Sequence, residues 1–135
     1  MDDLKLLALA RDAAQNAHCP YSKFQVGAAL LTSDGNVFCG CNVENASYGL
    51  TICAERNAVC AAIAAGYRDF VSIALVATRI ATPCGACRQF LAEFVQPTFR
   101  VLVGSLSAAD KHQVYTMEDL LPHHFTFQLL GDRGL

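Results

Sequence analysis

The chain has 135 residues, which fits a single domain spanning residues 1–135 with one hydrophobic core. Apolar residues make up 53% and charged residues only 16%, so we expect other subunits to cover part of the apolar surface. Ten basic and twelve acidic side chains give a net charge of −2 without a run of Lys or Arg, which disfavours nucleic acid as a partner and favours a small, nearly neutral ligand.

The N-terminal sequence predicts a cytoplasmic protein. It has no basic leader followed by an apolar stretch, and no segment approaches the roughly twenty apolar residues of a membrane span, so no membrane contact is expected. Seven cysteines are an odd number in a chain without a secretory signal, so we expect reduced thiols in place of a complete disulfide framework. Reduced thiols are available to a metal ion.

The first half of the chain predicts a helix followed by a hairpin. Residues 2–17 carry apolar side chains at helical spacing and stop before Pro20. Strands are expected at 26–32 and 37–44, because a turn rich in Asp and Gly separates two apolar runs. The polar residues that follow, 45–51, predict a loop.

The second half predicts alternating helices and strands. Helices are expected at 53–65 and 84–95, and strands at 71–78 and 99–104. This order favours the α/β class, a three-layer α/β/α sandwich whose mixed sheet has about five strands, with parallel central strands and the hairpin as an antiparallel edge. Beyond Ser105 the pattern gives a short helix near 117–121 and an apolar stretch at 125–130, without fixing their placement.

Three cysteines lie where two of these helices begin. Cys84 and Cys87 are three residues apart, so their thiols share one face of the first helical turn, and Cys53 starts the other helix. Helix N-termini carry a partial positive charge, which favours the thiolates that zinc requires. Three thiolates around a tetrahedral zinc leave the fourth position to water, which is the arrangement of a catalytic site.

Glu55 and Arg56 follow the first of these cysteines directly. Glu55 lies roughly 200° around the helix from Cys53, so it is predicted to move protons and not to bind the same ion. Three thiolates give the site a net negative charge, and Arg56 is predicted to offset it by a hydrogen bond to a ligand sulfur.

The Cys-x-x-Cys pair alone also fits a thioredoxin-like redox site or half of a structural zinc site. Cys53 and Glu55 favour the catalytic zinc, since a redox pair needs neither and no fourth Cys or His stands at the spacing of a structural site. The remaining cysteines are interpreted as structural, with Cys60 in the core because it lies seven residues after Cys53 on the same helix.

Cys-Ala-Glu at 53–55 and Pro-Cys-Gly-Ala-Cys-Arg-Gln at 83–89 closely resemble the zinc-dependent cytidine deaminases of the homotetrameric, three-cysteine type. Segments 21–30, 42–49 and 120–125 share the resemblance. It implies one zinc ion per subunit, bound by Cys53, Cys84 and Cys87, and hydrolysis of cytidine and 2′-deoxycytidine to the uracil nucleosides and ammonia in pyrimidine salvage. Glu55 would take a proton from water, protonate N3 of the pyrimidine, and then pass a proton to the leaving amine.

The resemblance also implies the nucleoside contacts. Phe24 would stack near the base, and Asn42 and Glu44, which point the same way along a strand, would bind the ribose 3′-hydroxyl. The backbone groups of Ala54 and Thr82 would face the base. In the homotetramer, four residues would help to complete a neighbour's site: Ala46, Ser47, Tyr48 and Phe125. For the two aromatic residues, ordinary apolar packing stays equally open.

Two other functions stay open. One is deamination of a different aminopyrimidine nucleoside such as blasticidin S, whose deaminases resemble this chain around both cysteine motifs. The other is a non-enzymatic zinc or thiol module. Asn42 together with Glu44 favours an ordinary nucleoside, and Glu55 favours an enzyme.

Overall fold

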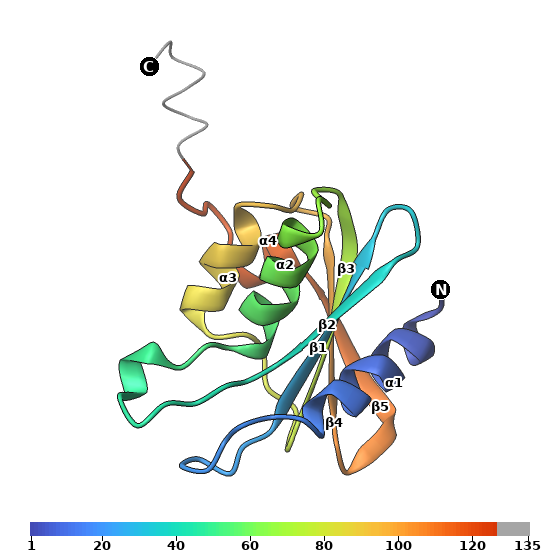
Figure 1. Cartoon of the computed structure of the whole chain (residues 1–135). Coiled ribbons are helices and arrows are strands. Elements are labelled where there is room, and N and C mark those ends of the chain that lie inside the picture. Colours follow the sequence, from blue (N-terminus) through green and yellow to red (C-terminus); the bar gives the residue numbers. More distant parts are fainter. Residues whose placement is uncertain (127–135) are drawn as a thin grey trace.

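The computed structural model describes residues 1–126, which form one mixed sheet between two layers of helices (Figure 1). The sheet has the strand order β2-β1-β3-β4-β5. Its strands are β1 (Val26–Thr32), β2 (Val37–Cys41), β3 (Phe70–Ala77), β4 (Arg100–Ser105) and β5 (Ala108–Thr116). The helices are α1 (Asp3–Ala14), α2 (Ala54–Ala64), α3 (Gly85–Ala92) and α4 (Met117–Leu120), with a 3₁₀ turn at Tyr48–Leu50.

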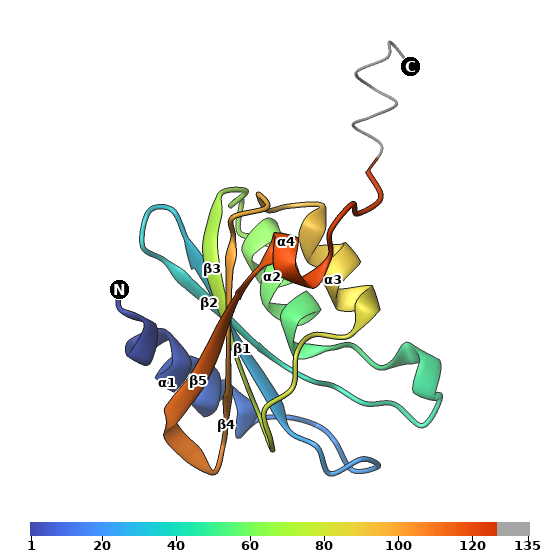
Figure 2. The ribbon, with the colours of Figure 1, turned by 180° about the vertical axis from the view of Figure 1, so that it is seen from behind.

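Helix α1 covers one face of the sheet and the other helices cover the opposite face, as Figure 2 shows from behind. The predicted three-layer sandwich is confirmed.

The strand directions agree with the prediction. The predicted strands at 71–78 and 99–104 are β3 and β4, which are parallel neighbours, and the hairpin β1–β2 forms an antiparallel edge. The other edge is β5, which pairs antiparallel with β4 and was not predicted. The edge strand β5 carries mostly exposed side chains, so it lacks the apolar run that marks a strand in sequence.

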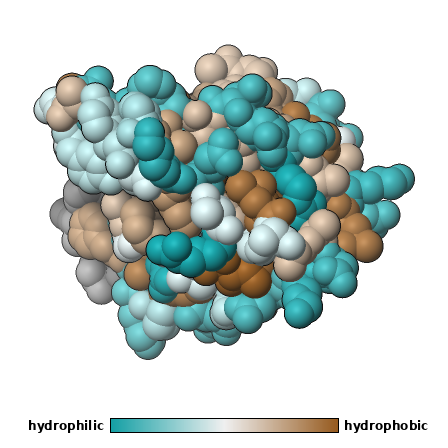
Figure 3. All heavy atoms as spheres, turned by 90° about the horizontal axis from the view of Figure 1, so that it is seen from below, coloured by the Kyte–Doolittle hydropathy of each residue, from teal (hydrophilic) through white to brown (hydrophobic). Residues whose placement is uncertain are grey.

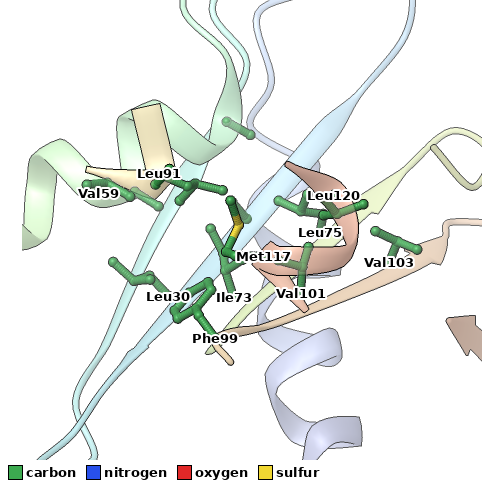
Figure 4. Packing of buried hydrophobic residues seen from close by; sticks show 14 of the residues in the cluster. Leu30, Val59, Ile73, Leu75, Leu91, Phe99, Val101, Val103, Met117 and Leu120 are labelled. Atoms are coloured by element: carbon green, nitrogen blue, oxygen red, sulfur yellow. The ribbon is translucent and has the colours of Figure 1, made fainter. Parts of the chain in front are cut away.

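Strand β3 is buried on both faces, which explains its continuous apolar sequence. Ile73 and Leu75 point toward α2, α3 and α4, where they join the larger core cluster (Figure 4). Ala74 and Val76 alternate with them and pack under α1 in a second cluster. The sheet is therefore held between two apolar layers and supports the elements at its ends.

Glycine in β2 lets α2 lie directly on the sheet. A Cβ atom at Gly40 would stand 2.6 Å from both the carbonyl oxygen of Ala54 and the backbone nitrogen of Ala58. The Asn57 side chain then donates from Nδ2 to the carbonyl oxygen of Cys41 at 2.8 Å. Close packing of the first turn of α2 on β2 fixes where this helix begins.

Several element ends and one burial prediction differ from the sequence interpretation. The predicted strand at 37–44 stops at Cys41, after which Val43 makes isolated bridges with residues 18 and 52. Cys60 is exposed and not in the core, because α2 buries the face that carries Ala58, Val59 and Ala62. All seven cysteines are free thiols. The predicted apolar stretch at 125–130 lies mostly outside the described residues.

Within residues 1–126, no helix has the length and apolar character that crossing a membrane requires.

Candidate metal centre and active site

The structure brings three cysteines together at the starts of two helices. Cys53 is the N-cap of α2, Cys84 is the N-cap of α3, and Cys87 lies in the first turn of α3. Their Sγ atoms all lie within 4.8 Å of one another, and no other group of three or more potential metal ligands occurs in the described part of the chain. Cys87 is buried, Cys53 is half-buried and Cys84 is exposed, so the cluster opens on one side.

This donor set fits a zinc ion. A tetrahedral zinc with Zn–S bonds of about 2.3 Å places its sulfurs roughly 3.8 Å apart, which needs only small movements from the observed cluster. The Arg56 guanidinium donates from Nη2 to Cys53 Sγ at 3.4 Å. The neighbouring Cys87 thiol, together with Arg56, lowers the pKa of Cys53 to about 5. At least one ligand is therefore held as the thiolate that binds zinc.

Glu55 lies in the first turn of α2, one residue after the helix begins. Its side chain is only 5% exposed, and burial raises the pKa of its carboxyl group. It lines the same cavity as Cys53 and Cys84 but does not belong to the group of sulfur ligands. A buried carboxyl with a raised pKa, beside a site for a metal ion, is suited to accept and return a proton near neutral pH.

A cavity of about 290 Å³ extends from the cysteines. It lies at the carboxyl end of β3, where β1 begins and where α2 and α3 start. Seen from below Figure 1, apolar side chains gather near the middle of the molecular face and hydrophilic ones surround them (Figure 3). Six of the predicted substrate residues line the cavity: Phe24, Asn42, Glu44, Tyr48, Ala54 and Thr82. The other three, Ala46, Ser47 and Phe125, do not line it.

Two buried polar side chains form one end of the cavity. Asn42 donates to the carbonyl oxygen of Phe24 at 2.8 Å and accepts from the backbone N–H of Val26 at 2.9 Å. Glu44 accepts from the Ser22 hydroxyl at 2.5 Å and from the backbone N–H groups of residues 21 and 22 at 3.1 Å. The hydroxyl of Ser22, followed by these backbone groups, lowers the pKa of Glu44. Glu44 is therefore a fixed hydrogen-bond acceptor that stays ionised at neutral pH.

The rim of the cavity is much more exposed than its floor. Tyr48, which lines the cavity, is 63% exposed, and Phe125, which does not line it, is 64% exposed, so neither packs in the core of the subunit. Arg79 stacks over the ring of Phe24, with its guanidinium carbon 5.3 Å from the ring centroid. Ordinary core packing is thus excluded for both exposed aromatic residues.

Sequence reasoning missed several residues of the cavity wall. Ser22 stands inside the segment 21–30 that carries the family resemblance, but the acid that accepts its hydroxyl, Glu44, lies 22 residues away, so no local signal marks the contact. Leu75 and Ala77 line the cavity from the end of β3, where their alternation along the strand indicates a shared face. Pro83 adds to the wall before Cys84, although it was interpreted only as a helix start.

Residues 1–104 match the family model described as the cytidine and deoxycytidylate deaminase zinc-binding region. The chain belongs to this deaminase family. Among curated relatives, the cytidine deaminase of Halalkalibacterium halodurans is 48% identical over 134 residues, which cover 98% of this chain and 100% of that one. The cytidine deaminase of Sporosarcina psychrophila is 44% identical over 128 residues, 93% of each chain. The blasticidin-S deaminase of Bacillus cereus is more distant, at 28% over 134 residues and 92% of each chain.

Solved structures of the deaminase family have the same fold. The crystal structure of cytidine deaminase from Burkholderia pseudomallei matches with a TM-score of 0.88 and 48% identity, over 93% of this chain and 100% of that one. That of cytidine deaminase from Mycobacterium tuberculosis matches with a TM-score of 0.78 and 40% identity, over 93% and 99%. The zinc-binding region of the family model contains all three clustered cysteines, which is consistent with the fit of their donor atoms.

Proposed function

We propose that this protein is a zinc-dependent hydrolase that converts cytidine to uridine and ammonia. The observation that carries the proposal is a three-sulfur cluster and a buried glutamate opening into one cavity of about 290 Å³. The high identity to curated cytidine deaminases along almost the whole chain supports the choice of substrate. We extend the proposal to 2′-deoxycytidine, to a role in pyrimidine salvage in the cytoplasm, and to a homotetramer with shared active sites.

In this proposal Cys53, Cys84 and Cys87 hold one zinc ion. Zinc lowers the pKa of a water ligand and so supplies a nucleophile at neutral pH. Arg56 donates to Cys53 Sγ and offsets part of the negative charge of three thiolates. The protein thereby keeps the ion in a site whose exposed side, near Cys84, faces the cavity.

Glu55 is the proposed proton carrier. Its carboxylate would accept one proton from water as the water oxygen bonds to C4, and would deliver that proton to N3 of the pyrimidine ring. The same carboxylate would then move the proton of the new C4 hydroxyl to the amino nitrogen, so that the C4–N bond breaks, ammonia leaves and the C4 carbonyl forms. Burial supports both roles, because a raised pKa makes this carboxylate a better base than an exposed glutamate.

The other cavity residues are proposed to orient the nucleoside. Phe24 would pack against the base, while the backbone groups of Ala54 and Thr82 would face its polar edge. Asn42 and Glu44 would bind the ribose 3′-hydroxyl. This assignment of Asn42 and Glu44 is supported by their position, because both side chains are buried beside the cavity and held by hydrogen bonds to the backbone around Phe24.

Four exposed residues, Ala46, Ser47, Tyr48 and Phe125, are proposed to reach a neighbouring subunit's site. The exposed aromatic rings of Tyr48 and Phe125 would gain apolar burial in such a contact. Sedimentation analysis of the zinc-loaded protein measures the oligomeric state. A monomer with full activity would contradict the proposed sharing of sites.

The function is tested by following ultraviolet absorbance during incubation with cytidine, together with ammonia release and zinc content. We expect one zinc ion per chain and equal amounts of uridine and ammonia. Blasticidin S is tested as the alternative substrate. If the protein turned it over faster than cytidine, blasticidin S would be the preferred substrate and the proposal for cytidine would be wrong. Folded, zinc-loaded protein that releases no ammonia from either compound would identify a non-enzymatic zinc module instead.

A further inference from the structure

In the described part of the chain, the segment 79–83, which forms one wall of the cavity, is held by hydrogen bonds from a single side chain, that of Arg88. The segment 79–83 connects β3 to the metal ligand Cys84 and has no regular secondary structure. Ala81, Thr82 and Pro83 from this segment line the cavity. Among residues 1–126, the only hydrogen bonds that reach residues 79–83 come from Arg88.

The Arg88 side chain folds back from α3 over the start of its own helix. Its Nε donates to the carbonyl oxygen of Pro83 at 2.7 Å, and its Nη2 donates to the Thr82 hydroxyl at 2.8 Å. The Pro83 carbonyl belongs to the peptide that leads into Cys84, so the first bond fixes the chain immediately before a metal ligand. The second bond turns the Thr82 hydroxyl toward Arg88.

The third bond of Arg88 reaches a distant part of the chain. Its Nη1 donates to the carbonyl oxygen of Leu120 at 2.7 Å, at the end of α4. Leu120 is buried in the larger core cluster, so this bond anchors the guanidinium to the core. No carboxylate forms a salt bridge with Arg88 in the described part of the chain, where the single salt bridge joins Arg100 and Asp3.

We propose that Arg88 is a positioning residue that holds the 79–83 wall against the pyrimidine base. This proposal rests on the proposed deaminase function for the identity of the ligand. The planar guanidinium fork matches three acceptors that lie in different directions, which the single ammonium group of lysine cannot do. Losing these bonds frees the wall next to the reacting ring, and small misplacements of a bound substrate cost large factors in rate or affinity.

The test compares Arg88→Ala and Arg88→Lys with Arg68→Ala as a matched control. Arg68 is exposed and also donates to two backbone carbonyls, those of Ile63 and Tyr67, but it does not line the cavity. For Arg88→Ala we expect unchanged zinc content, a KM for cytidine raised about tenfold, and a kcat within about threefold, because all three charge-assisted hydrogen bonds of this side chain are lost. Arg88→Lys should fall between this variant and the wild type, and Arg68→Ala should match the wild type.

A second measurement does not depend on activity. Arg79 is exposed and followed by Ile80, so trypsin can cut inside the wall, and mass spectrometry measures the rate of that cut. We expect Arg88→Ala to be cut after Arg79 about ten times faster than the wild type, because the segment has lost the two hydrogen bonds that Arg88 donates to it. Inactivity of the wild type toward cytidine would defeat the proposed function, while faster cutting would still support the role of Arg88 in fixing the wall.

The opposite results are equally specific. An unchanged KM and unchanged cutting in folded Arg88→Ala would overturn the proposal, and so would a fall in kcat that follows zinc content while KM stays constant. If Arg88→Ala does not fold, Thr82→Val and Thr82→Ser decide. Thr82→Val removes the hydroxyl that accepts from Arg88 and should raise both the KM and the rate of cutting after Arg79 about threefold. Thr82→Ser keeps a hydroxyl and should return both values to those of the wild type.

Discussion

The two ends of the cavity are built in different ways. At the metal end, Cys53 caps α2, Glu55 and Cys87 lie in the first turns of α2 and α3, and these helices pack on the larger core cluster. At the other end, Asn42 and Glu44 lie on connecting segments and are fixed by hydrogen bonds to the backbone of residues 21–26. The proposed catalytic group and the sulfur cluster are thus positioned by helix packing, and the proposed recognition groups by hydrogen bonds to a separate segment of the chain.

The largest expected effect is at the metal end. Glu55→Ala should lower kcat at least about a thousandfold, because the proposed general acid and base is removed from the cavity. Zinc content and the fold should remain, since Glu55 is not among the sulfur ligands. Kinetics with cytidine and metal analysis measure both, with Glu93→Gln as a control for an exposed glutamate. Residual activity above one tenth of the wild type would show that Glu55 does not carry the proton.

Helix packing at the metal end can be disturbed without touching a functional group. Gly40→Ala places a methyl group 2.6 Å from two backbone atoms of α2, so the helix must shift. We expect a loss of about 2–4 kcal/mol in the free energy of unfolding and weaker zinc binding, as for overpacking against rigid backbone. Urea unfolding and a zinc competition assay measure these effects. Gly49→Ala is the control, because nothing lies within 4 Å of its added methyl group, and equal losses in the two variants would contradict this explanation.

A smaller effect is expected at the recognition end. Glu44→Gln should raise the KM for cytidine about tenfold with little change in kcat, because one ionised acceptor is lost while the proton carrier remains. Glu118→Gln, outside the cavity, should leave KM unchanged. A decrease in kcat with an unchanged KM would show that Glu44 takes part in the chemical step and not in substrate binding.

The pH dependence of Glu44 follows from its lowered pKa. An acid whose pKa is lower in the folded state stabilises the fold above its unfolded pKa of about 4.3, and this contribution is lost as the pH falls through the folded value. The difference in unfolding free energy between wild type and Glu44→Gln should therefore be constant from pH 8 to pH 6 and shrink toward pH 3. A difference that grows on acidification would contradict the assigned direction.

The smallest expected effect concerns the sugar. If Asn42 and Glu44 address the 3′-hydroxyl, loss of the 2′-hydroxyl removes no contact with these two side chains. The values of kcat/KM for cytidine and 2′-deoxycytidine should then agree within about fivefold, roughly 1 kcal/mol. Strict selectivity for ribose would require a further contact at the recognition end.

The sequence was more informative about the metal end than about the rest of the molecule. Cys53, Glu55 and the paired cysteines carry their chemistry in their residue types and their helical spacing, so their convergence was predictable. The contacts of Ser22 and Arg88 depend on where separate segments meet, and no local pattern encodes that. Strand β5 was not predicted for a related reason. It is an edge strand that pairs only with β4, and its mostly exposed side chains give no apolar run in the sequence.

The ligand cysteines come from two helices that are separated in the chain by the whole of β3. An ion bound by all three sulfurs therefore acts as a cross-link between α2 and α3, and its binding energy adds to the cohesion of the fold. The melting temperature should consequently rise with the free zinc concentration, so that removal of the metal by a chelator should lower the stability of the fold as well as the activity.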